Sequence, residues 1–348
     1  MAWKLLGKHM SRCAELVLDT HDADLGFEDI PDLSFPQLTS FHRKGDGLPR
    51  PCFIEALSRA PSLAQLSSWC TYPRDSTPYS QLTHLEVVYV SSEGVEELLD
   101  VLFACTRLDI LELCIVESDH LAGRKVSMPS LRKLTIGRVH DMIHGDFLSA
   151  LFQCFRLPSL VRLELNAEEW SLVTSVHMAA MLESCSATLR EVVIHVDTTA
   201  AFESPSSHSP NHPLVTALRP LSHLNRLEFY VAQSFYFHPL PSFDNFVAPF
   251  LTQLRPDSNS ARHLFLPTLK WIVVDVEGVV FTSQVMETLL QTASSRQLAG
   301  LPFAELHCIL DEAEEPFVVE HQMAEQIKEL ERKGTRIVLK QGRAVLHT

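Results

Sequence analysis

The clearest pattern along the chain is a short apolar motif, L-x-x-[LVI]-x-[LVIF], that returns at irregular intervals. In each copy, apolar and polar residues alternate after the first leucine, which is typical of a short β-strand with one buried face. The copies are SQLTHLEVVYV from Ser80, TRLDILELCIV from Thr106, MPSLRKLTIGR from Met128, LPSLVRLELNA from Leu157, SATLREVVIHV from Ser186, LSHLNRLEFYV from Leu221 and LPTLKWIVVDV from Leu266.

Weaker copies extend the pattern toward both ends of the chain. They read CAELVL from Cys13, LTSFHR from Leu38, LAQLSS from Leu63 and FAELHC from Phe303. Most of the early gaps between first anchors fall near the 20 to 29 residues of leucine-rich repeats, and the later gaps are longer. A missed repeat would misassign the whole fold, so this periodicity outweighs any single local signal.

Helical apolar stripes occupy several of the segments between the strands. In Ser92 to Cys105, for example, Val95, Leu98, Leu99 and Leu102 recur at helical spacing. The other predicted helices span Cys52 to Ala60, Gly145 to Phe155, Thr174 to Cys185, Ser242 to Leu254, Thr282 to Arg296 and Pro316 to Lys333. One strand and one helix cannot bury an apolar face alone, so the repeats must stack.

The sequence therefore predicts an α/β leucine-rich-repeat solenoid, a horseshoe of about ten to eleven irregular strand-helix repeats with a parallel concave sheet. The whole chain, 1–348, is one solenoid in this interpretation. Within it we expect an N-terminal cap helix remnant (1–12), a flexible Ser/Pro/His loop insertion (202–213), an aromatic-rich insertion (233–262) and a C-terminal cap (312–348). The aromatic insertion either packs over the sheet edge as core or stays exposed as a contact patch.

The opening segment, WKLLGKHMSRCAELVLD from Trp3, resembles the entry to the leucine-rich-repeat region of basidiomycete F-box proteins. His9, Ser11 and Arg12 fit the usual phrase, and Cys13 stands where that family has tryptophan. The resemblance implies a substrate-recognition role in a ubiquitin ligase. An F-box opens with a Leu-Pro pair and docks on the Skp-type adaptor, and no such module is recognisable here, so we expect a repeat region without its F-box.

Composition narrows the class of partner. The formal net charge is −14, whereas binding to a phosphate backbone depends on clustered lysine and arginine, so we expect no nucleic-acid partner. Apolar runs are too short to span a bilayer, which predicts no membrane partner.

The cysteines are scattered without a Cys-x-x-Cys pair, which favours an intracellular, reducing compartment, cytoplasmic or nuclear. Three of them end predicted helices and are expected to be buried: Cys105, Cys154 and Cys185.

Motifs that carry catalytic chemistry are missing from the sequence. It contains no Gly-x-Ser-x-Gly elbow, no phosphate-binding loop and no dinucleotide fingerprint. His140 and His144 have zinc-helix spacing but lack the glutamate of such motifs, and the acidic cluster after Asp19 does not match the spacing of a calcium loop. We therefore expect no enzyme activity, cofactor or metal site.

The predicted sheet leaves one face for recognition. Side-chain alternation puts four glutamates in one outward column, namely Glu86, Glu112, Glu164 and Glu228. Like charges on neighbouring strands repel unless a cationic partner or the basic flankers Lys133, Arg162 and Arg226 compensate. We expect this face to bind a basic protein segment, with Trp69, Tyr230 and Trp271 as aromatic anchors. The alternative is a solvated face whose acids serve solubility.

The sequence thus favours a non-catalytic protein-protein interaction module. Its leading interpretation is an F-box-type substrate-recognition or scaffold protein, with the ubiquitin-ligase link implied by resemblance alone. The alternative is a stand-alone leucine-rich-repeat scaffold with no ubiquitin role.

Overall fold

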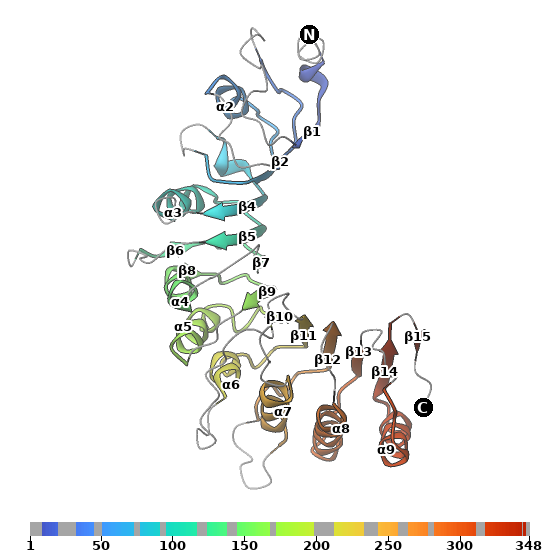
Figure 1. Ribbon diagram of the computed structural model, residues 1–348. Coiled ribbons are helices and arrows are strands. Elements are labelled where there is room, and N and C mark those ends of the chain that lie inside the picture. The colour runs from blue at the N-terminus through green and yellow to red at the C-terminus, as the bar shows by residue number, and fades with distance from the viewer. Residues whose placement is uncertain are drawn as a thin grey trace. The chain divides into compact units, whose positions relative to one another are not determined.

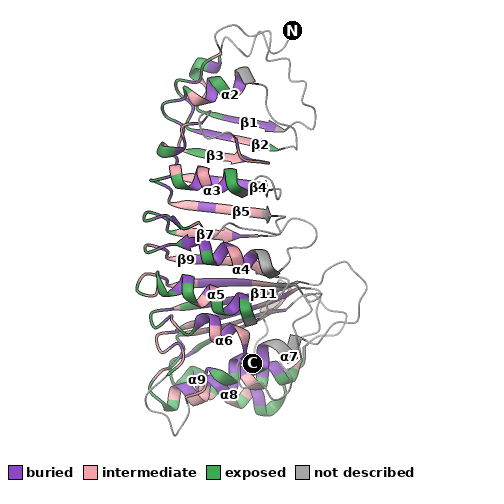
Figure 2. Ribbon diagram, turned by 90° about the vertical axis from the view of Figure 1, so that its left-hand side faces the viewer, coloured by how far each residue is buried: buried purple, intermediate pink, exposed green. Residues whose placement is uncertain are grey.

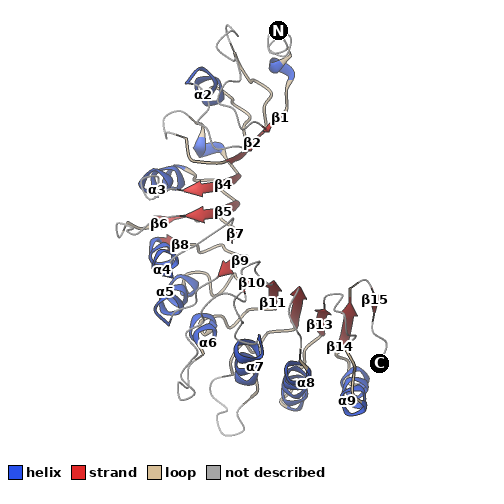
Figure 3. Cartoon of the chain, viewed as in Figure 1, coloured by secondary structure: helices blue, strands red, loops and turns tan. Residues whose placement is uncertain are grey.

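The chain forms two compact α/β units, residues 1–160 and 161–348 (Figure 1). The computed structural model describes residues 9–19, 33–44, 51–72, 77–90, 95–116, 124–137, 145–167, 172–197, 212–232, 243–256, 264–277, 282–310, 317–342 and 344–345. In both units parallel strands form the sheet and the helices lie together on one side of it (Figure 3). The predicted α/β class is therefore confirmed.

The first unit contains a parallel sheet in the order β1-β2-β3-β4-β5-β7. Its strands are β1 Glu15–Asp19, β2 Ser40–Lys44, β3 Gln65–Ser68, β4 His84–Val90, β5 Ile110–Val116 and β7 Lys133–Ile136. Its helices are α2 Pro51–Ser58, α3 Val95–Ala104 and α4 Gly145–Cys154, with 3-10 turns η1 Met10–Arg12 and η4 Tyr79–Gln81. Two short strands, β6 Val126–Ser127 and β8 Phe155–Arg156, pair in a separate parallel ladder.

The second unit repeats this design in the order β9-β10-β11-β12-β13-β14-β15. The strands are β9 Arg162–Ala167, β10 Glu191–Asp197, β11 Arg226–Ala232, β12 Trp271–Glu277, β13 Glu305–Leu310, β14 Arg336–Gln341 and the antiparallel β15 Ala344–Val345. The helices are α5 Leu172–Glu183, α6 Pro213–Leu218, α7 Phe243–Gln253, α8 Ser283–Leu298 and α9 His321–Arg332.

The apolar positions of the repeated motif form the core between strands and helices (Figure 2). In the copy from Ser80, Leu82, Leu85 and Val87 are at most 1% exposed. The equivalent residues of later copies are buried in the same way, from Leu108, Leu111 and Leu113 to Phe303, Leu306 and Cys308. Each of these copies thus contributes three apolar side chains to the core.

A backbone ladder joins successive repeats just before each strand. In the first unit the carbonyl of Thr83 accepts hydrogen bonds from the amides of Asp109 and Ile110, at 2.8 and 3.0 Å. The Asp109 carbonyl accepts in turn from Arg132 and Lys133. In the second unit the same pairing runs through Val161, Arg190, Asn225, Lys270 and Ala304. This ladder sets the register in which side chains of neighbouring strands meet.

The predicted helices all appear within a few residues of their expected bounds. The largest difference is at the start of α9, which begins at His321 rather than Pro316. Helix α6 was not predicted, because six residues give too short an apolar stripe to recognise. Its first turn begins at Pro213 and is capped by His212, whose Nδ1 accepts from the Leu214 amide at 3.2 Å.

Several predicted segments lie wholly or partly outside the described residues. These are 202–211 of the loop insertion, most of 1–12, His140, His144 and the acidic cluster beyond Asp19. In the aromatic insertion, residues 243–256 form α7 and its end, and Phe250 packs edge-on against Phe229 with ring centroids 5.5 Å apart. That part of the insertion is core. In the predicted C-terminal cap, α9 covers β14 and turns a charged face outward.

Arg296 holds the second unit together in a way that the sequence pattern did not indicate. This side chain of α8 is 1% exposed. Its guanidinium donates to the carbonyls of Leu254, Phe265, Leu266, Pro267 and Leu269 at 3.0–3.4 Å, and it lies 4.8 Å from the Phe303 ring centre. Burial lowers the pKa of Arg296 to about 10, so it stays protonated at neutral pH.

We predict that Arg296→Met lowers the free energy of unfolding by about 3–5 kcal/mol, because buried carbonyls lose their donor. Urea denaturation followed by circular dichroism measures the change. The exposed Arg332→Met on α9 is the matched control and should shift stability by less than about 0.5 kcal/mol. Equal losses of unfolding free energy in the two variants would show that the hydrogen bonds of Arg296 do not stabilise the second unit.

Candidate functional site

The candidate site is the sheet face opposite the helices. Its central row consists of the outward residue in the middle of each strand. In the first unit the strand pairings align Val17, His42, Ser67, Glu86, Glu112 and Thr135. In the second they align Glu164, Val193, Glu228, Val273 and His307. Within each unit, the column predicted from the motif therefore exists.

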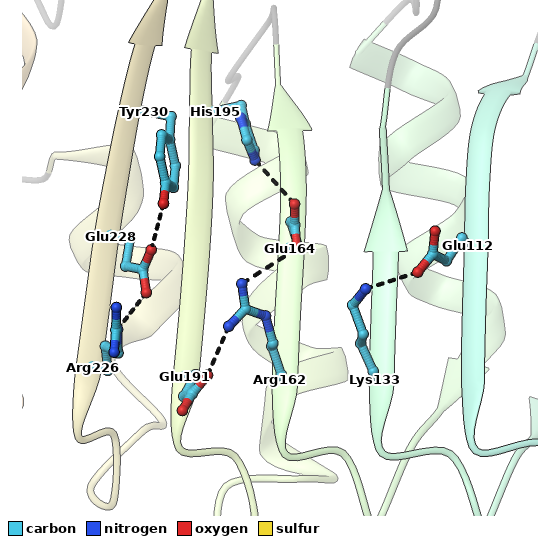
Figure 4. A network of polar contacts seen from close by, with 9 residues as sticks. All are labelled: Glu112, Lys133, Arg162, Glu164, Glu191, His195, Arg226, Glu228 and Tyr230. Atoms are coloured by element: carbon cyan, nitrogen blue, oxygen red, sulfur yellow. Dashed lines mark hydrogen bonds and ion pairs between the residues drawn. The ribbon is translucent and has the colours of Figure 1, made fainter. Parts of the chain in front are cut away.

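In the first unit, Glu86 and Glu112 are directly paired neighbours on β4 and β5. The Lys133 ammonium reaches from β7 to the Glu112 carboxylate at 2.7 Å, and both side chains are partly exposed (Figure 4). Among the described side chains, Glu86 makes no ion pair. This cluster therefore contains two carboxylates and one cation.

In the second unit, Arg162 of β9 forms ion pairs with two glutamates (Figure 4). Its Nη1 lies 2.9 Å from Glu191 and its Nη2 lies 3.6 Å from Glu164. Partial burial opposes the charge of Arg162, but the hydrogen bond to Glu191 and the nearby carboxylates outweigh it and raise the pKa. His195 also contacts Glu164, with Nε2 3.2 Å from the carboxylate. This cluster again holds one more carboxylate than permanent cations.

Glu228 corrects the expectation that all four glutamates of the column are exposed. Its side chain is only 3% exposed. Arg226 Nε donates to one carboxylate oxygen and Tyr230 Oη donates to the other at 3.0 Å (Figure 4). The flanking row residues Val193 and Val273 are buried as well. Glu228 is therefore an internally satisfied charge.

Tyr230 is held from two sides. Its ring stacks on His195 with centroids 4.9 Å apart and an angle of 15° between the planes. Burial, together with the hydrogen bond to Glu228, raises the pKa of Tyr230 to about 12. The hydroxyl is therefore protonated at neutral pH and available only as the donor to Glu228. Its ring, by contrast, remains partly accessible.

The predicted aromatic anchors do not form one patch. Trp271 begins β12 and pairs in register with Arg226 and Glu305, whereas Tyr230 pairs with Asp275. An offset of four residues along the strand separates the two side chains by roughly 13 Å. Trp69 follows the end of β3 in the other unit and is half-buried.

A further charged group, on β13 and β14, was not predicted from the sequence. Glu305 of β13 bonds His307 at 2.5 Å and Arg336 at 3.0 Å, and the hydrogen bond from His307 lowers the pKa of Glu305. Glu305 and Arg336 occupy the row that contains Arg162, Glu191 and Arg226. The position two residues before the central row would have identified them.

The predicted burial of the corner cysteines is confirmed. Cys105, Cys154 and Cys185 are at most 2% exposed. Burial raises the pKa of Cys105 and Cys185 to about 12, so both thiols stay protonated at neutral pH. They serve as small core residues.

The described part of the chain shows no group of three metal-ligating side chains. In the same residues, no helix is long and apolar enough to cross a lipid bilayer. No family model matches the chain, and no curated protein is significantly similar to it.

We predict that Tyr230→Phe lowers the free energy of unfolding by about 1–3 kcal/mol, because the buried Glu228 carboxylate loses a donor. Urea denaturation gives the value. As a control, Glu331→Gln on the exposed face of α9 should change it by less than about 0.5 kcal/mol. A loss in Tyr230→Phe no larger than in the control would show that the hydrogen bond contributes nothing.

Proposed function

We propose that this chain is a non-catalytic protein-interaction module of the leucine-rich-repeat type, with ten to eleven repeats in a horseshoe. It binds a basic segment of a protein partner through the sheet face opposite the helices. The observation that carries this proposal is the surplus of carboxylates in two clusters of that face. Glu86 lies beside Glu112, which alone bonds Lys133, and Glu164 and Glu191 share Arg162.

Each cluster has one carboxylate more than its permanent cations, so one additional cation would neutralise it. Side chains on adjacent strands are about 4.8 Å apart, so a second carboxylate beside a neutralised one keeps an unfavourable repulsion. A lysine or arginine from a partner removes it. Because one partly exposed ion pair contributes only about 0.2–1 kcal/mol, a partner needs several such contacts for useful affinity.

Trp271 is the best-placed anchor for such a partner. It is half-buried and lies between Arg226 and Glu305 on neighbouring strands. Arg226 is already paired with Glu228, and Glu305 with Arg336, so the ring is flanked by groups that need no further partner. The indole can therefore contribute apolar contact area, as tryptophan does at interface hot spots.

The resemblance to F-box repeat regions suggests the cellular role. In that role the chain selects substrates for a ubiquitin ligase in the cytoplasm or nucleus, and an F-box supplied elsewhere contacts the Skp-type adaptor. The alternative is a scaffold that acts without ubiquitin. Both roles use the same recognition face, the sheet face opposite the helices. Only the ligase role requires the Skp-type adaptor.

The surplus of carboxylates gives the first prediction about binding. The full chain is measured by fluorescence polarisation against peptides of equal length that are lysine- and arginine-rich, neutral or acidic. We expect preference for the basic peptides, and we expect Glu86→Gln with Glu191→Gln to weaken their binding about 2- to 30-fold.

The matched control is Glu96→Gln with Glu331→Gln. It removes the same net charge from exposed positions on α3 and α9, one in each unit, and should leave binding unchanged. Equal binding of basic and acidic peptides, or equal losses in the two double variants, would sink the proposal of a basic partner.

A second prediction separates the ligase from the scaffold. If the chain acts in a ligase, the protein purified from its own cells should co-purify with the Skp-type adaptor. Absence of the adaptor from that complex leaves the scaffold interpretation. The charge variants should not affect this association, because the adaptor contacts the F-box.

A further inference from the structure

A second polar cluster lies away from the recognition face, on the helix side of the first unit. It gathers at the carboxyl ends of the parallel strands β2 and β3. Arg43 is the fourth residue of β2 and points inward, while Ser68 ends β3 and Cys70 and Tyr72 follow it.

The donors of this cluster are buried and unsatisfied. Arg43 is 3% exposed and Tyr72 is fully buried. Arg43 Nε and Nη1 have no hydrogen-bond partner. The Tyr72 hydroxyl lies close enough to the Arg43 guanidinium and to Ser68 for both to oppose the effect of burial on its pKa, but it completes no hydrogen bond of full geometry with either. By contrast, Ser68 Oγ donates to the Cys70 carbonyl and Tyr79 Oη donates to the Tyr72 carbonyl.

The charge of Arg43 also has no counter-ion among the described residues. Burial raises the pKa of Tyr72 to about 12 and also raises the pKa of Cys70, so both groups are neutral at pH 7. Glu97 of α3 influences Cys70 but is exposed and makes no ion pair with Arg43. A guanidinium does not lose its proton in proteins, and an uncompensated buried charge is strongly destabilising.

The contrast with Arg296 sharpens the point. Arg296 is buried to the same degree, but it donates to five carbonyls and lies against an aromatic ring. Within the described residues, Arg43 Nε and Nη1 have no carbonyl partner, and no aromatic ring is found against the guanidinium. A water molecule would accept a hydrogen bond from Arg43 but would not neutralise it, whereas an anion does both.

We propose that Arg43 and Tyr72 form a binding site for a small oxyanion at the carboxyl ends of β2 and β3. The guanidinium supplies charge and donors, and the phenol supplies a further donor. Inorganic phosphate is the probe of this chemistry. The site is separate from the recognition face, because Arg43 points to the helix side of the sheet whereas Glu86 and Glu112 lie in the central row of the other face.

The test is equilibrium dialysis of the full chain against radiolabelled phosphate at constant ionic strength. We expect about one phosphate per chain, displaced by sulfate and not by chloride. Arg43→Met should abolish binding, and Tyr72→Phe should weaken it about 3- to 10-fold through loss of one hydrogen bond. Arg59→Met, an exposed arginine of the same unit, is the control and should bind as the unchanged chain does.

Saturable binding that is lost in Arg43→Met and kept in Arg59→Met supports the site. No binding at millimolar phosphate overturns it and leaves water as the acceptor. Binding that survives in Arg43→Met, or that chloride displaces equally well, also overturns it. If Arg43→Met does not fold, Tyr72→Phe decides, since unchanged affinity there contradicts the proposed donor set. Basic-peptide binding should be the same with and without phosphate, so the two proposals fail separately.

Discussion

The structure depends on the backbone ladder that links equivalent residues of successive repeats. One carbonyl before each strand accepts from two amides of the next repeat, as Thr83 does from Asp109 and Ile110. This contact holds each strand in register with its neighbour, and the buried leucines then stack on the helix side. Because the ladder repeats from strand to strand within each unit, a residue type that recurs in the motif forms a row across the sheet of that unit.

On the sheet face opposite the helices, the ladder brings like charges together. Glutamates recur at the central motif position, so the ladder brings carboxylates such as Glu86 and Glu112 next to each other. The chain compensates in two ways. Lys133 and Arg162 neutralise part of the charge at the surface, while Glu228 is removed from solvent and bonded to Arg226 and Tyr230. What remains is a modest acidic surplus, located in two clusters rather than along the whole column.

The two buried arginines illustrate the difference between a structural and an unsatisfied charge. Arg296 organises the irregular segment before β12, where carbonyls of Leu254, Leu266 and Leu269 point toward it. This allows a longer repeat to join the same ladder. Arg43 occupies a strand position that is Ser68 in β3 and apolar from β4 onward, as at Leu113 and Ile136. A permanent charge at an inward position departs from the apolar pattern of the motif. An anionic ligand would compensate this charge.

The sequence by itself determined the strands of the repeated motif, most helices, the α/β class and the alignment of the central row within each unit, because a periodic motif encodes local structure and stacking register together. It did not determine which row residues are exposed. Glu228 is bonded to Arg226 and Tyr230 of its own strand and is flanked by the buried Val193 and Val273 of the neighbouring strands, and the stacking of His195 on Tyr230 also joins two strands. The roles of Arg296 and Arg43 were also decided only by tertiary structure. Whether a buried donor is satisfied depends on carbonyls and hydroxyls distant in the chain, and no local pattern records those distances.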